Sequence, residues 1–307
     1  MKPLFIFPGQ GSQSMGMGKD FYDNSDTAKA MIEAASERLG FDFKALLFEE
    51  NDRLEQTEFT QPAILLVSCI AHALFKEKSS MTPFFALGHS LGEFSALVSV
   101  GALNYLDAVA LVHQRGLLMK EACAGKDAGM MALLGLQDDQ VEALCEEARA
   151  SGKQVWAANY NSDGQIVIAG SRSDLASLES TFKDAGAKRA LLLNMSVASH
   201  CPLLTSAQEP LAASLETYMT DSFSTAIISN VTAKPYSSKA EALELLKDQL
   251  VKPVRYRHSI EAYESEVDCF IEFGGTVLKG LNRRATKKTT HCIVDMATLE
   301  QVVAELS

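Results

Sequence analysis

Short apolar runs alternate along the chain with longer segments in which apolar residues recur every three or four positions. Runs such as 4–7 and 84–87 predict buried strands, and periodic segments such as 25–39 and 105–123 predict amphipathic helices. Strands that alternate with helices are typical of an α/β fold with a mostly parallel sheet. Further expected elements are a helix over 60–77 with Thr60 as its N-cap, helices over 173–185 and 203–218, and a strand over 225–231.

The pattern changes between residues 125 and 196. There the predicted order is strand, helix, strand, strand, helix, strand, and Ser162-Asp163-Gly164 predicts a hairpin turn because Asp-Gly readily supplies positive φ angles. This βαββαβ order is that of the ferredoxin-like unit. We therefore predict a large α/β-hydrolase-like subdomain formed by 1–124 and 197–307, with a small ferredoxin-like subdomain, 125–196, inserted into it.

The stretch from Phe84 to Leu97 predicts a strand, a sharp turn and a helix. At the turn, G-H-S-L-G matches the G-x-S-x-G pattern, whose glycines permit a tight bend that exposes the serine hydroxyl near a helix N-terminus. The helix amides favour an anion there, such as a tetrahedral oxyanion. Ser90 is therefore the candidate nucleophile. Ser90 and Glu93 also fit a capping box, in which both would only stabilise the helix.

Two charged or titratable side chains add to this candidate site. Arg115 lies on the apolar face of the helix predicted over 105–123, so its guanidinium needs an anionic partner, either a structural carboxylate or a substrate carboxylate. His200 lies in a loop where the chain re-enters the large subdomain, which suits a general base or a hydrogen-bonded structural histidine.

Three further residues are candidates for contacts around Ser90. Gln10 follows the first strand, at the strand end where open α/β sheets bind ligands, although an ordinary turn would place the same residue there. Gln61 in the first turn of its helix could face the site or face solvent. His89 lies within the turn itself, which suits a neighbour of the oxyanion or of the ester better than a base.

Composition narrows the function classes. With 307 residues, 47% of them hydrophobic, and a mean hydropathy near zero, the chain is expected to be a soluble cytoplasmic protein. A net charge of −11 argues against a nucleic-acid binder, and the most apolar run, 63–75, is too short to span a membrane. Six cysteines without a C-x-x-C pair and six histidines without ligand spacing argue against a disulfide framework or a metal site. We expect no cofactor.

A series of short motifs runs in order through nearly the whole chain: F-P-G-Q-G-S-Q (7–13), G-H-S-L-G-E (88–93), Q-R-G (114–116), N-x-N-S-x-x-Q-x-V-I-A-G (159–170), S-H (199–200) and the region of Gln249. Together they resemble the malonyl-CoA:acyl carrier protein transacylase family, in its stand-alone bacterial form, which is related to the acyltransferase domains of polyketide synthases. One departure is Phe273-Gly274-Gly275, where the family often has Gly-Pro-Gly.

The resemblance implies a role for each matching residue. Ser90 would carry the malonyl group as an ester, and His200 would be the base, oriented by the backbone carbonyl of Gln249. The backbone N–H groups of Gln10 and Leu91 would form the oxyanion hole.

Arg115 would pair with the free malonyl carboxylate, and His89 and Gln61 would contribute to substrate binding. The implied reaction transfers malonyl from malonyl-CoA to the phosphopantetheine thiol of an acyl carrier protein, in fatty acid biosynthesis. Alternatives are a serine esterase or thioesterase, a polyketide-type acyltransferase of broader acyl specificity, and a non-catalytic subunit that binds acyl-CoA or a carrier.

Docking of an acidic carrier protein would need a basic patch on this acidic chain. Basic residues gather over 279–288 and at Lys188 and Arg189, and either group could bind a carrier or simply be a solvated face.

Overall fold

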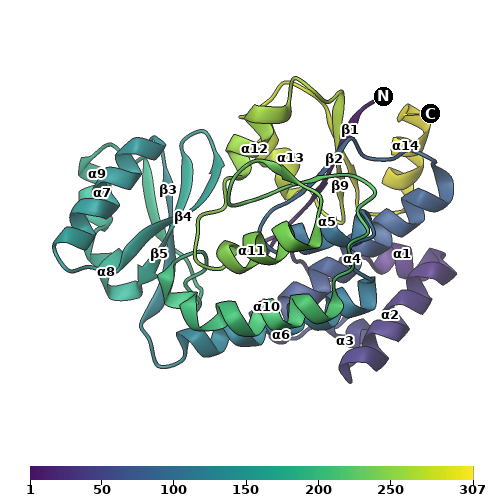
Figure 1. Cartoon of the computed structure of the whole chain (residues 1–307), viewed down its shortest axis with the longest axis horizontal. Helices are drawn as coiled ribbons and strands as arrows, with labels where there is room; N and C mark the ends of the chain where they lie inside the picture. The colour runs from purple at the N-terminus through teal and green to yellow at the C-terminus, as the bar shows by residue number, and fades with distance from the viewer. Residues whose placement is uncertain (307) are drawn as a thin grey trace.

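The computed structural model describes residues 1–306 and contains two β-sheets (Figure 1). The larger sheet has the strand order β10-β9-β1-β2-β7-β8, and only β8 runs antiparallel to its neighbour. This confirms the predicted α/β fold with a mostly parallel sheet. The strands are β1 (Pro3–Phe7), β2 (Phe85–Gly88), β7 (Ile227–Ile228), β8 (Pro235–Tyr236), β9 (Cys269–Phe273) and β10 (Thr290–Ile293).

Helices cover both faces of this sheet, and its central strand β1 is therefore buried on both sides. In β1, Phe5 and Phe7 belong to one apolar cluster, and the alternating Leu4 and Ile6 belong to another. The helices of this part are α1 (Lys19–Asn24), α2 (Asp26–Leu39), α3 (Phe43–Phe48), α4 (Thr57–Lys78), α5 (Gly92–Ser99), α6 (Tyr105–Cys123), α10 (Gln208–Tyr218), α11 (Lys239–Gln249), α12 (Tyr256–Tyr263), α13 (Val277–Asn282) and α14 (Met296–Leu306), with 3₁₀ turns η1 (Arg53–Glu55) and η2 (Pro202–Ala207).

The smaller sheet is antiparallel, with the order β4-β5-β3-β6, and it confirms the predicted ferredoxin-like insertion. It packs with its own helices around a separate apolar cluster and lies on the left in Figure 1. The proposed subdomain bounds, 125 and 196, remain a prediction. The elements are β3 (Ala128–Leu134), α7 (Asp138–Ala150), β4 (Val155–Ser162), β5 (Gln165–Ser171), α8 (Arg172–Ser177), α9 (Glu179–Asp184) and β6 (Arg189–Leu192).

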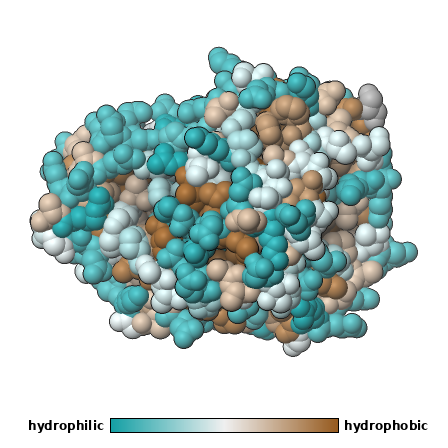
Figure 2. All heavy atoms as spheres, in the orientation of Figure 1, coloured by the Kyte–Doolittle hydropathy of each residue, from teal (hydrophilic) through white to brown (hydrophobic). Residues whose placement is uncertain are grey.

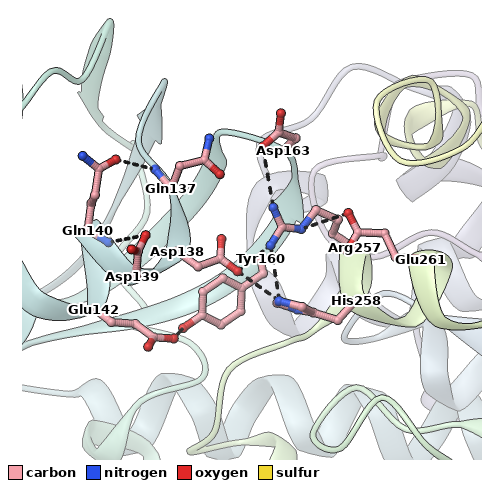
Figure 3. Close-up of polar contacts among 10 residues, drawn as sticks. All are labelled: Gln137, Asp138, Asp139, Gln140, Glu142, Tyr160, Asp163, Arg257, His258 and Glu261. Carbon is pink, nitrogen blue, oxygen red and sulfur yellow. Dashed lines mark hydrogen bonds and ion pairs between the residues drawn. The ribbon is translucent and has the colours of Figure 1, made fainter.

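Backbone and side-chain contacts fasten the small sheet to the large part. Val254, just before α12, donates to the Ala158 carbonyl at 2.8 Å and accepts from the Tyr160 N–H at 2.9 Å. Figure 3 shows Arg257 and His258 of α12 reaching Asp138 at the start of α7, at 2.5 and 3.0 Å. These contacts hold β4 against the large sheet, so residues of β4 can contribute to a site between the two parts.

The start of α4 corrects one prediction. The helix begins at Thr57, with Gln56 at the N-cap, and therefore Thr60 is an interior residue rather than the cap. Pro62 lies inside the helix, where its missing N–H cannot bond the Glu58 carbonyl four residues earlier. The Nδ1 atom of His113 on α6 bonds that carbonyl instead, at 2.6 Å.

The apolar stretch of α4 is also longer than the run 63–75. By length and composition this helix is sufficient to cross a membrane, but 89% of its most apolar window is buried inside the fold, as in the core helix of a globular protein. The face of the molecule in Figure 2 is mostly hydrophilic, with apolar atoms exposed only in small areas.

Three other predicted elements differ from the structure. The helix expected over 173–185 is divided at Leu178, a turn residue with φ of −95° and ψ of −1° that separates α8 from α9. The helix over 203–218 starts as the 3₁₀ turn η2. The strand over 225–231 shortens to Ile227–Ile228 because the chain then turns back, with the Ala233 N–H donating to the Ser229 carbonyl at 2.9 Å.

Candidate active site

The turn between β2 and α5 holds Ser90 with φ of +53°, a left-handed conformation that is unusual for a residue with a side chain. Close backbone approach requires both flanking glycines. A Cβ on Gly88 would lie 1.8 Å from the Gly92 carbonyl carbon, and one on Gly92 would lie 2.0 Å from the Phe7 oxygen. The predicted elbow is therefore built by local glycines and by contact with β1.

A residue that follows strand β7 holds the elbow in place. The Asn230 Oδ1 atom accepts from the Ser90 N–H at 2.6 Å, and Asn230 Nδ2 donates to the Gly88 carbonyl at 2.6 Å. The N-cap of α5 is Leu91, and the Ser90 hydroxyl makes no cap bond. The capping-box alternative does not describe this turn, and the hydroxyl is free for another partner.

That partner is His200, whose Nε2 lies 2.8 Å from the Ser90 Oγ. The other ring nitrogen, Nδ1, lies 2.7 Å from the backbone oxygen of Gln249. Because a carbonyl only accepts, Nδ1 carries the proton and Nε2 is left as an acceptor for the serine hydroxyl. Burial, with a smaller effect of Arg115, lowers the pKa of His200 to about 3, so the ring is neutral near pH 7.

Arg115 reaches the same place from α6 and is 2% exposed. One guanidinium nitrogen donates to Gln61 Oε1 at 2.6 Å, and the other lies 3.3 Å from the Ser90 Oγ and 3.0 Å from Gln249 Oε1. All these acceptors are neutral. Within residues 1–306 this guanidinium forms no ion pair with a carboxylate, and its Nε has no hydrogen-bond partner. Of the two partners considered from sequence, a structural carboxylate is not the one in contact.

Gln10 and Leu91 both line the cleft beside Ser90. In the described part of the chain, neither backbone N–H donates to a protein acceptor. The Gln10 side chain is held by Thr57, whose hydroxyl lies 3.0 Å from Oε1. Two N–H groups at the N-terminal end of α5 and at the end of β1 match the arrangement expected of an oxyanion hole. That role remains a prediction.

His89 connects the two parts of the molecule across the cleft. Its Nε2 lies 2.7 Å from Asn161 Oδ1 on β4, and burial lowers its pKa. The His89 ring, held by this hydrogen bond, is one of the polar groups that line the cleft beside Ser90. The structure therefore brings together all eight predicted site residues, which are Gln10, Gln61, His89, Ser90, Leu91, Arg115, His200 and Gln249.

The cleft itself has a volume of about 130 Å³ and lies between the two sheets. The large part contributes the residues around Ser90, and Met130, Asn159, Asn161 and Val167 come from the small sheet. Leu193 and Met195, in the segment that returns from β6, line the same cleft. A small, mostly apolar volume at this position is suited to a short acyl group.

Three residues that support the site were missed from sequence. Asn230 holds the elbow, Asn161 holds His89, and Tyr236 donates to the buried Glu93 at 3.0 Å. A signal existed for Asn161, which belongs to the motif over 159–170, whereas Asn230 fell inside the strand predicted over 225–231 and follows a strand only in the structure. Tyr236 lies on β8, a two-residue strand for which the hydrophobic pattern contains no signal.

The basic residues over 279–288 lie away from this cleft. Lys279 lies on α13, and the other four, from Arg283 to Lys288, follow that helix and precede Thr290, where β10 begins, whereas Ser90 follows the end of the parallel strand β2. The starts and ends of parallel strands lie at opposite edges of a sheet. This cluster therefore does not border the cleft, and its use as a carrier-docking patch loses support.

Comparison with known proteins shows one family. The model of the acyl transferase domain family matches residues 4–297. A malonyl CoA-acyl carrier protein transacylase of Bacillus subtilis is 38% identical over 309 aligned positions, covering 99% of this chain and 97% of the relative.

Solved structures agree over the full length. The crystal structure of a malonyl-CoA:acyl carrier protein transacylase from Helicobacter pylori superposes with a TM-score of 0.97 at 47% identity, covering 100% of this chain and 98% of that one. A malonyl-transacylase solved in complex with a type II polyketide synthase acyl-carrier protein has a TM-score of 0.95 at 35% identity, with 99% and 100% covered.

Proposed function

This chain belongs to the acyl transferase domain family, and from that premise we propose that Ser90 carries a malonyl group between two thiols. The enzyme transfers malonyl from malonyl-CoA to the phosphopantetheine thiol of an acyl carrier protein, the step that supplies malonyl units to fatty acid biosynthesis. The full-length match to relatives named for this reaction supports the assignment.

The first half-reaction acylates the serine. The Ser90 Oγ attacks the thioester carbon while Nε2 of His200, 2.8 Å away, takes the hydroxyl proton. The N–H groups of Gln10 and Leu91 stabilise the tetrahedral oxyanion. When the intermediate collapses, the C–S bond breaks and the CoA sulfur takes the proton from His200, so CoA leaves as a thiol and the ring is neutral again. A thiolate is a good leaving group, so the neutral carbonyl of Gln249 suffices where many hydrolases have a carboxylate.

The second half-reaction reverses these roles. The carrier's thiol gives its proton to His200 as its sulfur attacks the ester carbon. The bond to the Ser90 Oγ then breaks, and the oxygen recovers the proton from His200. The enzyme is regenerated, and the malonyl thioester is conserved throughout.

One observation carries the choice of malonyl over other acyl groups. Arg115 is buried 3.3 Å from the Ser90 Oγ, and its partners are neutral. A buried cation without a carboxylate partner favours an anionic ligand. The free carboxylate of a malonyl ester supplies that anion, and acetyl groups cannot. Pairing with this carboxylate also offsets the effect by which Arg115 lowers the pKa of His200, so the base is stronger with the malonyl substrate.

Mass spectrometry of the intact protein tests the proposal directly. After incubation with malonyl-CoA, we expect one malonyl adduct on the peptide that contains Ser90, and no adduct in Ser90→Ala. Ser95→Ala is the matched control, because Ser95 is a buried serine on α5, just after the turn, whose hydroxyl has no hydrogen-bond partner in the described chain. A malonyl adduct retained in Ser90→Ala would place the nucleophile elsewhere.

The second step separates a transferase from a thioesterase. Adding carrier protein or pantetheine should remove the adduct much faster than water does. Release at the same rate without thiol would identify a hydrolase. Transfer by protein treated with a metal chelator would support the absence of a cofactor, and we also propose a cytoplasmic location, where CoA thioesters and carrier proteins meet.

A further inference from the structure

Glu93 is a buried carboxylate that the transfer chemistry above does not use. It lies in the first turn of α5, three residues after Ser90, and is 1% exposed. Its Oε2 accepts from Gln249 Nε2 at 2.8 Å and from the Asn230 N–H at 3.2 Å, and its Oε1 accepts from the Tyr236 hydroxyl at 3.0 Å. Every donor is neutral, so this buried acid has no cation in contact with it within the described chain.

The Gln249 side chain connects this carboxylate to the arginine of the site. Its Nε2 donates to Glu93, and its Oε1 accepts from Arg115 at 3.0 Å. When Glu93 is ionised, two buried charges of opposite sign thus face the two ends of one amide. The charges affect each other: Arg115 lowers the pKa of Glu93 against the larger effect of burial, and Glu93 raises that of Arg115.

Charge at both ends leaves the amide of Gln249 one favourable orientation. Rotating it by half a turn would direct its NH₂ group at the guanidinium and its oxygen at the carboxylate, placing like groups together. The amide nitrogen also donates to the Ser90 carbonyl at 3.0 Å, which fixes its position further. The oriented amide oxygen in turn holds the Arg115 nitrogen that lies 3.3 Å from the Ser90 Oγ.

We propose that Glu93 is a positioning residue for malonyl transfer, which acts through the Gln249 amide to hold Arg115 where it receives the substrate's free carboxylate. Glu93 is therefore a determinant of the preference for malonyl over acetyl groups, although it touches no substrate atom. This inference rests on the proposed function, because it presumes that a malonyl carboxylate binds at Arg115.

The test compares Glu93→Gln with wild type in steady-state transfer from malonyl-CoA and from acetyl-CoA. Loss of one hydrogen bond to a charged group corresponds to about a tenfold change. We expect KM for malonyl-CoA to rise about tenfold, kcat to change less than about threefold, and the malonyl-to-acetyl ratio of kcat/KM to fall about tenfold. The contact of His200 with the Gln249 backbone does not depend on the amide, which is why kcat changes little.

Two variants serve as matched controls. Glu272→Gln neutralises another fully buried glutamate, on β9 two strands from β2, whose carboxylate accepts only from backbone and thiol groups near α13. Tyr236→Phe removes a different donor from Glu93 and leaves the Gln249 contact intact. Both should leave the acyl ratio within about twofold of wild type, even if they lower stability.

A double-mutant cycle excludes a merely structural role. In an Arg115→Ala background, Glu93→Gln should produce no further change in the acyl ratio, because the residue through which it acts is gone. Additive effects would overturn the proposal, as would an unchanged ratio or a lowered KM for malonyl-CoA in folded Glu93→Gln.

If Glu93→Gln does not fold, Glu93→Asp takes its place. Aspartate keeps the charge but is one methylene too short to keep the bond to Gln249, so the ratio should again fall, and a wild-type ratio would overturn the proposal. Failure of the proposed function itself is distinguishable, since wild type would then form no malonyl adduct and transfer no malonyl group.

Discussion

A fully buried arginine, Arg115, and a largely buried one, Arg257, have opposite surroundings. Arg257, at the contact between the two sheets, lies 2.5 Å from Asp138, 3.8 Å from Asp163 and 3.6 Å from Glu261 (Figure 3). Arg115, in the cleft, makes polar contacts within residues 1–306 only with the neutral groups of Gln61, Gln249 and Ser90. The charge of an arginine surrounded by carboxylates is compensated by its own fold. An arginine without carboxylate partners can bind an anionic ligand. The partners of a buried arginine therefore indicate whether it has a structural role or a binding role.

The largest effect that tests this contrast is on acyl selectivity. Arg115→Ala should lower kcat/KM for malonyl-CoA by about 100- to 1,000-fold, because the substrate carboxylate would lose its only cationic partner. Acetyl transfer should change far less. Competition between the two CoA esters, with the adducts resolved by mass, measures the ratio. Equal losses for both esters would mean that Arg115 acts on the serine and not on the carboxylate.

The next largest effect should be on stability, and it comes from Glu93, the carboxylate that Gln249 connects to Arg115. Burial raises the pKa of Glu93 from its ordinary value of 4.5 to about 7. The folded chain therefore binds this proton more tightly than the unfolded chain, and the free energy of unfolding falls as pH rises between these values. The loss is about 3 kcal/mol. Denaturant unfolding of wild type and Glu93→Gln across this range should show the difference shifting in favour of the variant, and parallel curves would contradict it.

The structural arginine should show the reverse pattern of effects. Arg257→Ala leaves Asp138 without its closest cation and should cost about 2 kcal/mol of unfolding free energy, less than a fully buried pair because Asp138 is 20% exposed. The malonyl-to-acetyl ratio should stay within about twofold of wild type. Denaturant titration and the competition assay measure the two quantities on one preparation. A changed ratio would show that the contacts of Arg257 in Figure 3 also affect acyl selectivity in the cleft.

The smallest effect should come from the outermost partner of that arginine. The Asp163 side chain is 61% exposed and lies 3.8 Å from Arg257, a distance and exposure at which ion pairs contribute little. Asp163→Asn should change stability by only about 0–0.5 kcal/mol. Asn-Gly is as suitable for the hairpin turn as Asp-Gly, so the turn is preserved. A thermal unfolding midpoint several degrees below wild type would show that the outer carboxylate is needed to satisfy the cation.

Much of the fold could be predicted because the type and order of its elements depend on short-range sequence patterns. Gly88 and Gly92 flank a serine at the end of an apolar run, and those features alone specify a strand, a bend and a helix. The predicted order of elements between 125 and 196 agrees with the four-stranded sheet because alternation and turn residues act over short distances. Errors occurred where a neighbour overrides propensity, as at Pro62, whose lost bond is compensated by His113 from another helix.

The sequence by itself determined the candidate residues: a serine in a glycine bend, an arginine on an apolar helix face and a histidine in a returning loop. Only the tertiary structure decided which groups meet. The backbone of Gln249, the amide of Asn230 and the carboxylate of Glu93 come from segments up to 156 residues apart. Local periodicity encodes the direction in which a side chain points from its own element, and contacts between distant elements arise only when those elements pack together.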